Sequence, residues 1–219
     1  MDARRVLALA PHTDDGEFGA GGTLARFVRE GREVHYVAFS AAGTDFSAAE
    51  KAVPAEFPTD VLRKELLGAT AKLGIPKKRV RCLDFEVRDF PRDRQRLLDA
   101  MISIRDEVKP DLVLLPSSHD THQDHRTVHD EGIRAFKFVS MLGYEVPWNN
   151  LSFDTTSFVF LDEADVAKKV EALKCYASQA GRPYANEEFI RSLARTRGTQ
   201  IGARYAEAFE VIRLVLRDS

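Results

Sequence analysis

Two short segments that combine imidazole and carboxylate side chains stand far apart in the chain. The first covers residues 11–15 and the second covers residues 122–125. Each follows an apolar run with the pattern of a buried strand, residues 5–10 in one case and 111–116 in the other. Ligands of parallel α/β sheets bind at the carboxyl ends of the strands. The two segments could therefore converge on one metal ion, which predicts a metal-activated hydrolase.

The residue types in these segments match the needs of metal-assisted hydrolysis. His12, Asp15 and His125 would provide two nitrogens and one oxygen, and a His₂-carboxylate set with an open position usually holds catalytic zinc. Such an ion lowers the pKa of water to about 7 and polarises a carbonyl. Asp14 need not bind the metal, because neighbouring side chains in a turn diverge, and it could act as general base. His122, if protonated, could stabilise an oxyanion or protonate a leaving amine.

The second segment leaves two further questions open. Asp124 could accept a hydrogen bond from a histidine ring and fix the orientation of that ring. His129 lies four residues after His125 on an expected helix, and that spacing is a known zinc-binding pattern. The pattern lacks the glutamate that usually follows the first histidine. We therefore favour His125 over His129 as the ligand.

Apolar periodicity predicts strands that alternate with helices along the chain. The expected strands are 5–11, 34–40, 80–85, 112–116, 157–161 and 208–216, and the expected helices are 19–31, 59–73, 92–108, 126–139, 163–176 and 187–197. Residues 41–58 are expected to form a long loop, and an irregular stretch is expected from residue 140 through 150. This alternation predicts an α/β fold with a Rossmann-like, doubly wound, mostly parallel sheet and helices on both faces. In the common strand order 3-2-1-4-5, the two polar segments would face one crevice.

The bulk properties of the chain describe an ordinary globular protein. Its 219 residues fit a single domain over 1–219, and a net charge of −2 gives no reason to expect nucleic acid or an anionic membrane as partner. No apolar stretch approaches the roughly 20 residues of a membrane span. Because a strand is predicted within five residues of the start, we expect no signal peptide. Cys82 and Cys175 are isolated and expected to be reduced, so a cytoplasmic location is expected.

A glycine-rich stretch follows the first segment. Gly19, Gly21 and Gly22 could suggest dinucleotide binding, but Leu24 stands where the fingerprint needs its last glycine. The acidic residues just before this stretch would also repel a pyrophosphate. We expect instead that the glycines allow a helix start to pack closely against the sheet.

Both segments resemble the signatures of one known family. Residues 12–22, His-Thr-Asp-Asp-Gly-Glu-Phe-Gly-Ala-Gly-Gly, resemble the His-x-Asp-Asp-x-Glu-x-Gly-x-Gly-Gly signature of the PIG-L/LmbE-like zinc N-deacetylases, and residues 122–125 resemble their second signature. Thr13 and Gln123 stand where the family usually has proline, which puts only loop rigidity in doubt. The similarity spans nearly the whole chain, with further matches at Arg63-Lys64-Glu65, Tyr176-Ala177-Ser178-Gln179, Arg197-Gly198 and Ala206-Glu207-Ala208-Phe209.

The resemblance implies a function and a role for each site residue. Members commonly remove an acetyl group from N-acetylglucosamine-type sugars, so the implied substrate is a small acetylated amino sugar or its conjugate. His12, Asp15 and His125 would bind one Zn²⁺ per chain, Asp14 would be the general base and His122 the electrostatic catalyst. Family members often form rings or dimers, which makes a homo-oligomer an expectation.

Two other functions compete with this one. A metal-dependent amidase or phosphoesterase could act on a non-sugar substrate, although phosphoester chemistry often uses two metals and carboxylates for a second ion are few. A nucleotide- or sugar-binding module without catalysis is disfavoured, because a binder has no need for Asp14 beside Asp15.

Three residues outside the two segments keep two interpretations each. Glu17 either suits the dipole of a helix start or orients a metal ligand. Arg63 either binds substrate, by a hydrogen bond to a sugar hydroxyl, or pairs with Glu65. Trp148, the only tryptophan, either stacks on a sugar face or packs into the core.

Overall fold

A computed structural model describes residues 3–41 and 60–216 of the chain. The predicted loop over 41–58 therefore lies outside the described residues, except for residue 41. Within the described part, none of the helices combines the length and apolar composition that a bilayer-spanning helix needs.

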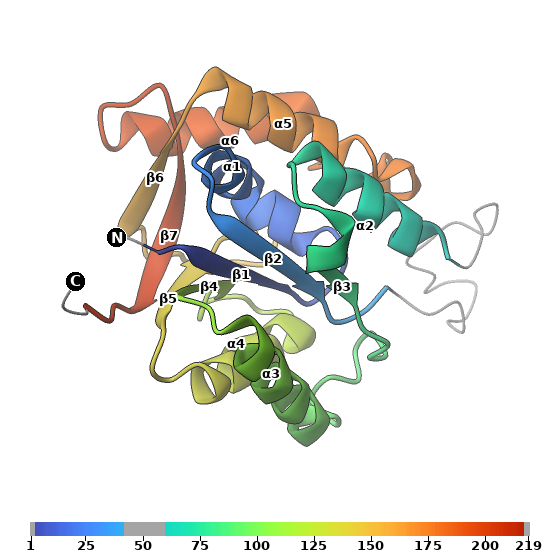
Figure 1. Ribbon diagram of the computed structural model, residues 1–219. Helices are drawn as coiled ribbons and strands as arrows, with labels where there is room; N and C mark the ends of the chain where they lie inside the picture. The colour runs from blue at the N-terminus through green and yellow to red at the C-terminus, as the bar shows by residue number, and fades with distance from the viewer. Residues whose placement is uncertain (1–2, 42–59, 217–219) are drawn as a thin grey trace.

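The centre of the described part is a seven-stranded sheet with the strand order β3-β2-β1-β4-β5-β7-β6 (Figure 1). The pairings from β3 through β5 are parallel, whereas β7 runs antiparallel to both β5 and β6. The order 3-2-1-4 of the first four predicted strands is thereby confirmed, whereas the strand predicted fifth, 157–161, is β6 at the far edge of the sheet. The strand bounds are β1 Arg5–Ala10, β2 Glu33–Ala38, β3 Val80–Cys82, β4 Leu112–Pro116, β5 Ser140–Tyr144, β6 Ser157–Leu161 and β7 Tyr205–Arg213.

Helices cover both faces of this sheet, as the doubly wound prediction requires. In Figure 1, α1, α2, α5 and α6 lie on one side of the strands, and α3 and α4 lie on the other. The α-helical bounds are α1 Asp15–Arg29, α2 Val61–Lys72, α3 Arg94–Val108, α4 Gln123–Ala135, α5 Glu163–Leu173 and α6 Glu187–Thr199, with short 3₁₀ helices η1 Lys77–Arg79 and η2 Ala177–Gln179.

The central strands are apolar on both faces because both faces are covered. In β1, Val6 packs in the same hydrophobic cluster as Leu24 of α1, whereas Leu7 packs with Met101 of α3 on the opposite face. Successive side chains of a strand point to opposite faces, so a strand buried on both sides needs a continuous apolar run. This explains why the run before each polar segment predicted a strand correctly.

The sequence pattern missed one strand, β5. All five of its residues are buried, but they lie in the stretch that was predicted to be irregular. Gly143 weakens the strand pattern, since glycine is a poor strand former. A Cβ atom at this position would lie 2.9 Å from the Cα atom of Ser117. Gly143 thus makes β5 difficult to recognise in the sequence, and it also allows the loop after β4 to pack closely against β5.

Two helices begin earlier than predicted. α1 begins at Asp15 rather than residue 19, and α4 begins at Gln123 rather than residue 126. The first turn of α4 is entirely polar and that of α1 combines acidic residues with glycine, so neither turn has the apolar period on which the prediction rested. Carboxylates in a first turn interact favourably with the helix dipole, and Asp15 and Asp124 occupy that place. Both polar segments therefore end in helix N-termini.

The glycines of α1 are required by close packing, as expected. A Cβ atom at Gly16 would lie 2.6 Å from the Tyr36 hydroxyl, and one at Gly19 would lie 2.2 Å from the Tyr144 ring. Such distances are shorter than real Cβ contacts, so a larger residue would push α1 away from the sheet. Because α1 begins at Asp15, its distance from the sheet also sets the position of the first polar segment.

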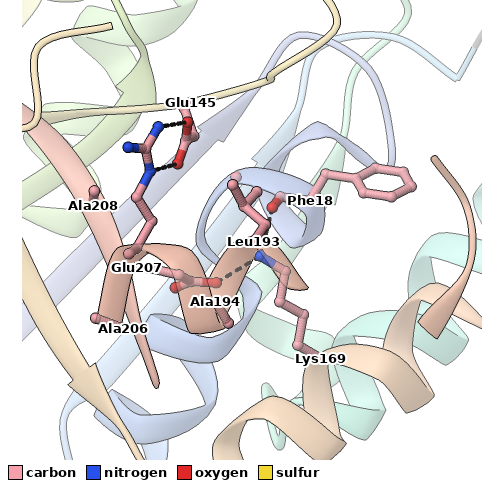
Figure 2. A pocket seen from close by; sticks show the side chains of 10 residues that line it. Phe18, Glu145, Lys169, Leu193, Ala194, Ala206, Glu207 and Ala208 are labelled. Atoms are coloured by element: carbon pink, nitrogen blue, oxygen red, sulfur yellow. Dashed lines mark hydrogen bonds and ion pairs between the residues drawn. The ribbon is translucent and has the colours of Figure 1, made fainter. Parts of the chain in front are cut away.

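A buried ion pair fastens α1 to α5 and β7. The Lys169 ammonium donates to the carbonyl of Phe18 at 2.6 Å and to Glu207 at 2.7 Å, as Figure 2 shows. Glu207 also accepts the backbone N–H groups of Gly22 and Thr23, at 3.0 and 2.7 Å. Both charged side chains are almost fully buried. Every charge is compensated by several partners, as burial of an ion pair demands.

A second ion pair, which is partly buried, joins Arg197 to Glu145 at 2.7 and 2.8 Å and borders the same small cavity. The cavity between the two pairs measures about 10 Å³, which is room for about one water molecule. It is too small for a substrate. The similarities at residues 197–198 and 206–209 thus belong to the framework around α1.

We predict that Glu207→Ala lowers the free energy of unfolding by about 3–5 kcal/mol, because it leaves the Lys169 ammonium buried without its carboxylate. Urea unfolding followed by circular dichroism measures this change. The control is Glu171→Ala, which changes an exposed residue of α5, the helix that carries Lys169. It should leave stability nearly unchanged. Equal stabilities of the two variants would contradict the role given to the buried pair.

Candidate metal centre and active site

The topology brings the two polar segments to one edge of the sheet. β1 and β4 are parallel neighbours, with Val6 paired to Leu112 and Ala8 to Leu114. Both strands therefore end at the same edge, where residues 11–15 follow β1 and the loop to α4 follows β4. This is also the point at which the strand order reverses, where open α/β sheets bind their ligands.

The three predicted metal ligands lie together at this edge. Oδ2 of Asp15 is 3.1 Å from Nδ1 of His12 and 3.1 Å from Nε2 of His125. The two nitrogens are 3.4 Å apart. Three atoms of the kind that bind zinc thus point to one place, and they come from two segments more than 100 residues apart in the sequence.

Each of the two histidines is held from behind by a buried carboxylate. His12 Nε2 lies 3.0 Å from Oδ2 of Asp124, and His125 Nδ1 lies 2.7 Å from Oδ2 of Asp120. Asp124 is 0% exposed and Asp120 is 2% exposed. A carboxylate on the far nitrogen fixes the orientation of the ring and makes the near nitrogen a better ligand. The donor set therefore fits a divalent metal ion.

The electrostatics of the cluster agree with this fit. Burial alone would lower the pKa of both histidines, but the Asp15 carboxylate and the hydrogen bonds to Asp124 and Asp120 raise the pKa of His12 to about 9 and of His125 to about 10. Burial alone would raise the pKa of Asp15, yet the two histidines hold it well below its usual value. A divalent ion would replace the protons of these rings, because metal ligands must be deprotonated.

Asp14 is placed next to the cluster but outside the ligand set. It precedes the first turn of α1, and its side chain makes no capping hydrogen bond. Burial and the neighbouring Asp15 carboxylate raise the pKa of Asp14 to about 6. At neutral pH the group is therefore still ionised, and it is a stronger base than an ordinary aspartate.

His122 is fixed at the N-terminus of α4, with its ring 5.0 Å from that of His12 and 4.8 Å from that of His125. Its Nδ1 accepts the backbone N–H of Asp124 at 3.1 Å. Burial and the nearby His125 and His12 lower the pKa of His122 to about 4. The ring is therefore neutral near pH 7 and carries its proton on Nε2, in contrast to the protonated form considered from the sequence.

Two of the other residues considered from the sequence, His129 and Arg63, stand outside the groups of potential ligands among the described residues. The Nδ1–H of His129 donates to the carbonyl of Pro116 at 2.8 Å, and His129 belongs to neither group of potential ligands among the described residues. Arg63 binds the carbonyl of Cys82 at 2.9 Å and pairs with Asp84, rather than with Glu65. Its role toward a substrate stays a prediction.

The two remaining open interpretations concern Glu17 and Trp148. The Glu17 carboxyl is fully buried against the hydroxyls of Tyr36 and Tyr176 instead of orienting a metal ligand, and burial raises its pKa to about 8. Trp148 stacks on Tyr184 with ring centroids 3.6 Å apart, yet it remains 36% exposed. The segment that follows Trp148 contacts the site loop, because the carbonyl of Asn149 accepts the N–H of Thr121.

Sequence reasoning missed two groups that organise the site. Asp120 holds His125, and its other oxygen accepts the backbone N–H of His122 at 2.9 Å. An aspartate two residues before the second segment was a usable signal for it. Arg88, in left-handed backbone at φ 72°, donates its N–H to Asp124 at 2.7 Å. Because the donor is a backbone N–H, the residue types in the sequence could not predict this contact.

An α/β sheet with two histidines and an aspartate at its reversal point presents potential metal ligands where open sheets of this class bind their ligands. The chain belongs to the PIG-L family: the family model, described as GlcNAc-PI de-N-acetylase, matches residues 7–136 and thus both polar segments. The family suggested by the sequence motifs is thereby confirmed.

Individual relatives extend the similarity over nearly the whole chain. This chain is 27% identical to the diacetylchitobiose deacetylase of Thermococcus kodakarensis, over 96% of this chain and 84% of that protein. The structure resembles the A40926 pseudoaglycone deacetylase Dbv21, with a TM-score of 0.79, 23% identity and coverage of 99% and 100% of the two chains. It also resembles GalB, the 4-carboxy-2-hydroxymuconate hydratase of Pseudomonas putida, with a TM-score of 0.77, 22% identity and 99% coverage of both chains. These two likenesses establish the fold alone.

We predict that Asp120→Ala lowers the affinity for zinc about 10–100-fold, because His125 loses the carboxylate that orients it. Competition with a chromophoric chelator measures the affinity. Asp154→Ala removes the carboxylate beside His119, 3.2 Å away at the surface, and should bind zinc like the unmodified protein. Zinc retained by His125→Ala but lost from His129→Ala would reverse the ligand assignment.

Proposed function

We propose that this protein is a zinc-dependent N-deacetylase that releases acetate from an N-acetylglucosamine-type sugar or sugar conjugate. The observation that carries this proposal is the geometry of His12 and His125. Each ring directs one nitrogen toward Asp15 and the other toward a buried carboxylate. Family membership and the named activity of the Thermococcus relative support the choice of reaction.

His12, Asp15 and His125 would hold a single zinc ion. When bound, zinc supplies a Lewis acid for the amide carbonyl and makes a water molecule more acidic. The described residues contain a second group of potential ligands, formed by His12, His122 and Asp124. It shares His12 with the first group, so the two do not offer independent sites for two ions. This argues against a two-metal phosphoesterase.

Asp14 and His122 divide the remaining chemistry between them. Asp14, ionised at neutral pH, accepts the proton of the attacking water and can deliver it to the nitrogen of the leaving amine. His122 offers the proton on Nε2 as a hydrogen-bond donor to the carbonyl oxygen as that oxygen becomes negative. A neutral donor suits this role because the site then gains no additional positive charge beside the metal.

The substrate would approach along the loops at the same sheet edge. The partly exposed Trp148 lies in the loop after β5, next to the site loop, and offers a flat apolar surface to a sugar ring. We include Arg63 of α2, whose guanidinium binds the carbonyl of Cys82 at the end of β3, as a substrate-binding residue. The likeness to a hydratase shows that this fold accepts more than one reaction, so the released product must be identified.

We predict acetate release from a panel of N-acetylated amino sugars, and its loss when a chelator removes the metal. Asp14→Asn should lower kcat about 10²–10⁴-fold with zinc retained, because the carboxamide cannot accept the proton. Acetate assays together with metal analysis measure both quantities, and Asp154→Asn serves as the surface control. Unchanged turnover in Asp14→Asn would eliminate the proposed base.

We predict that removal of the His122 ring lowers kcat about 10²–10³-fold with little change in KM, because its hydrogen bond strengthens only in the transition state. His122→Asn is the preferred variant, since asparagine keeps an acceptor for the exposed N–H groups of α4, whereas alanine also removes the helix cap. Loss of zinc from His122→Asn would make His122 a ligand and require a different division of roles.

A further inference from the structure

Two of the segments that resemble the family have no part in the chemistry above, and in the structure they contact each other. The first is residues 63–65 at the start of α2, and the second is residues 176–179 after α5. The backbone N–H and the hydroxyl of Ser178 donate to the Glu65 carboxylate at 2.9 and 2.5 Å. Both side chains are buried. This contact holds Tyr176, two residues earlier, against the loop that carries Asp14.

Tyr176 and Tyr36 converge on one carbonyl of that loop. The Tyr176 hydroxyl donates to the carbonyl oxygen of Thr13 at 2.7 Å, and the Tyr36 hydroxyl approaches the same oxygen at 3.0 Å. The two tyrosines are 3% and 0% exposed, so water does not compete for these bonds. Thr13 lies between the predicted ligand His12 and the predicted base Asp14.

The same hydroxyls hold the beginning of α1. Tyr36 accepts the backbone N–H of Gly16 at 3.1 Å, and the Glu17 carboxyl contacts both tyrosine hydroxyls. Residues on either side of Asp14 are thus tied to β2 and to the segment between α5 and η2. Neither hydroxyl belongs to a group of potential metal ligands among the described residues.

We propose that Tyr36 and Tyr176 are positioning residues for Asp14. The carbonyl of Thr13 and the N–H of Asp14 belong to one planar peptide unit. Two hydroxyls on the carbonyl oxygen fix this plane and so restrict the direction in which the Asp14 side chain leaves the backbone. The histidine ligands have separate supports in Asp124 and Asp120. Loss of a tyrosine hydroxyl should therefore disturb the base and leave metal binding intact.

This proposal rests on the proposed deacetylase function, and Tyr176→Phe tests it. We expect kcat to fall about 10–100-fold, since small displacements of a catalytic group have effects of this size, while KM and zinc content stay within about twofold. The matched control is Tyr144→Phe. It removes an equally buried hydroxyl that donates to the carbonyl of Leu9 in β1, at 2.9 Å, and it should keep kcat within about twofold.

Hydrogen exchange of the amides of residues 14–17 gives a readout independent of turnover. Tyr176→Phe and Tyr36→Phe should exchange these amides faster than Tyr144→Phe does, because the loop has lost a support. Should Tyr176→Phe fail to fold, Glu65→Gln weakens the anchor of Tyr176 without touching the loop, and the same comparison applies.

The outcomes separate the two proposals. A fall in kcat and faster exchange that are confined to the Tyr36 and Tyr176 variants support the positioning role. Equal kcat and equal exchange in Tyr176→Phe and Tyr144→Phe overturn it. If the unmodified protein releases no acetate from any substrate, the deacetylase function fails, and the exchange comparison still decides whether the tyrosines hold the loop.

Discussion

The structure depends on the burial of a cluster of acidic and imidazole groups at the carboxyl edge of a parallel sheet. Burying such groups is costly unless each has a partner of opposite character. Asp15 lies between His12 and His125, and each of these rings has a second carboxylate behind it. The arrangement requires β1 and β4 to be neighbours. It also requires that α1 and α4 begin within the two polar segments.

The framework around α1 follows from this requirement. Asp15 can reach His125 only if α1 lies close to the sheet, and glycines at its inner face allow that approach. The Lys169–Glu207 pair then fastens the middle of the helix, and Tyr36 and Tyr176 fasten its beginning. Residues with no chemical role thereby determine where the reactive side chains stand. This explains why the family resemblance extends well beyond the two polar segments.

The sequence was sufficient for the order of the first four strands and for the convergence of the two segments, because buried parallel strands have a clear apolar pattern and the doubly wound order is common. It did not predict β5, where Gly143 serves packing, or Asp120, whose partner is set by the loop conformation. Tyr36 and Tyr176 were equally hidden. A tyrosine in an apolar pattern indicates burial, but the carbonyl that its hydroxyl reaches depends on the tertiary fold.

The protonation state of His122 shows most clearly what a sequence cannot supply. The ring has the ordinary chemistry of histidine, and its sequence position is compatible with either a cation or a neutral donor. Burial beside two other imidazoles lowers its pKa, while burial beside a carboxylate raises that of Asp14. The same edge of the sheet thus produces a neutral donor and an ionised base from neighbouring groups. Environment also separates groups of one kind: the pKa of His122 is lowered while that of His125 is raised, and the pKa of Asp14 is raised while that of Asp15 is lowered. Because environment assigns the roles in this way, a shared fold alone does not determine the reaction.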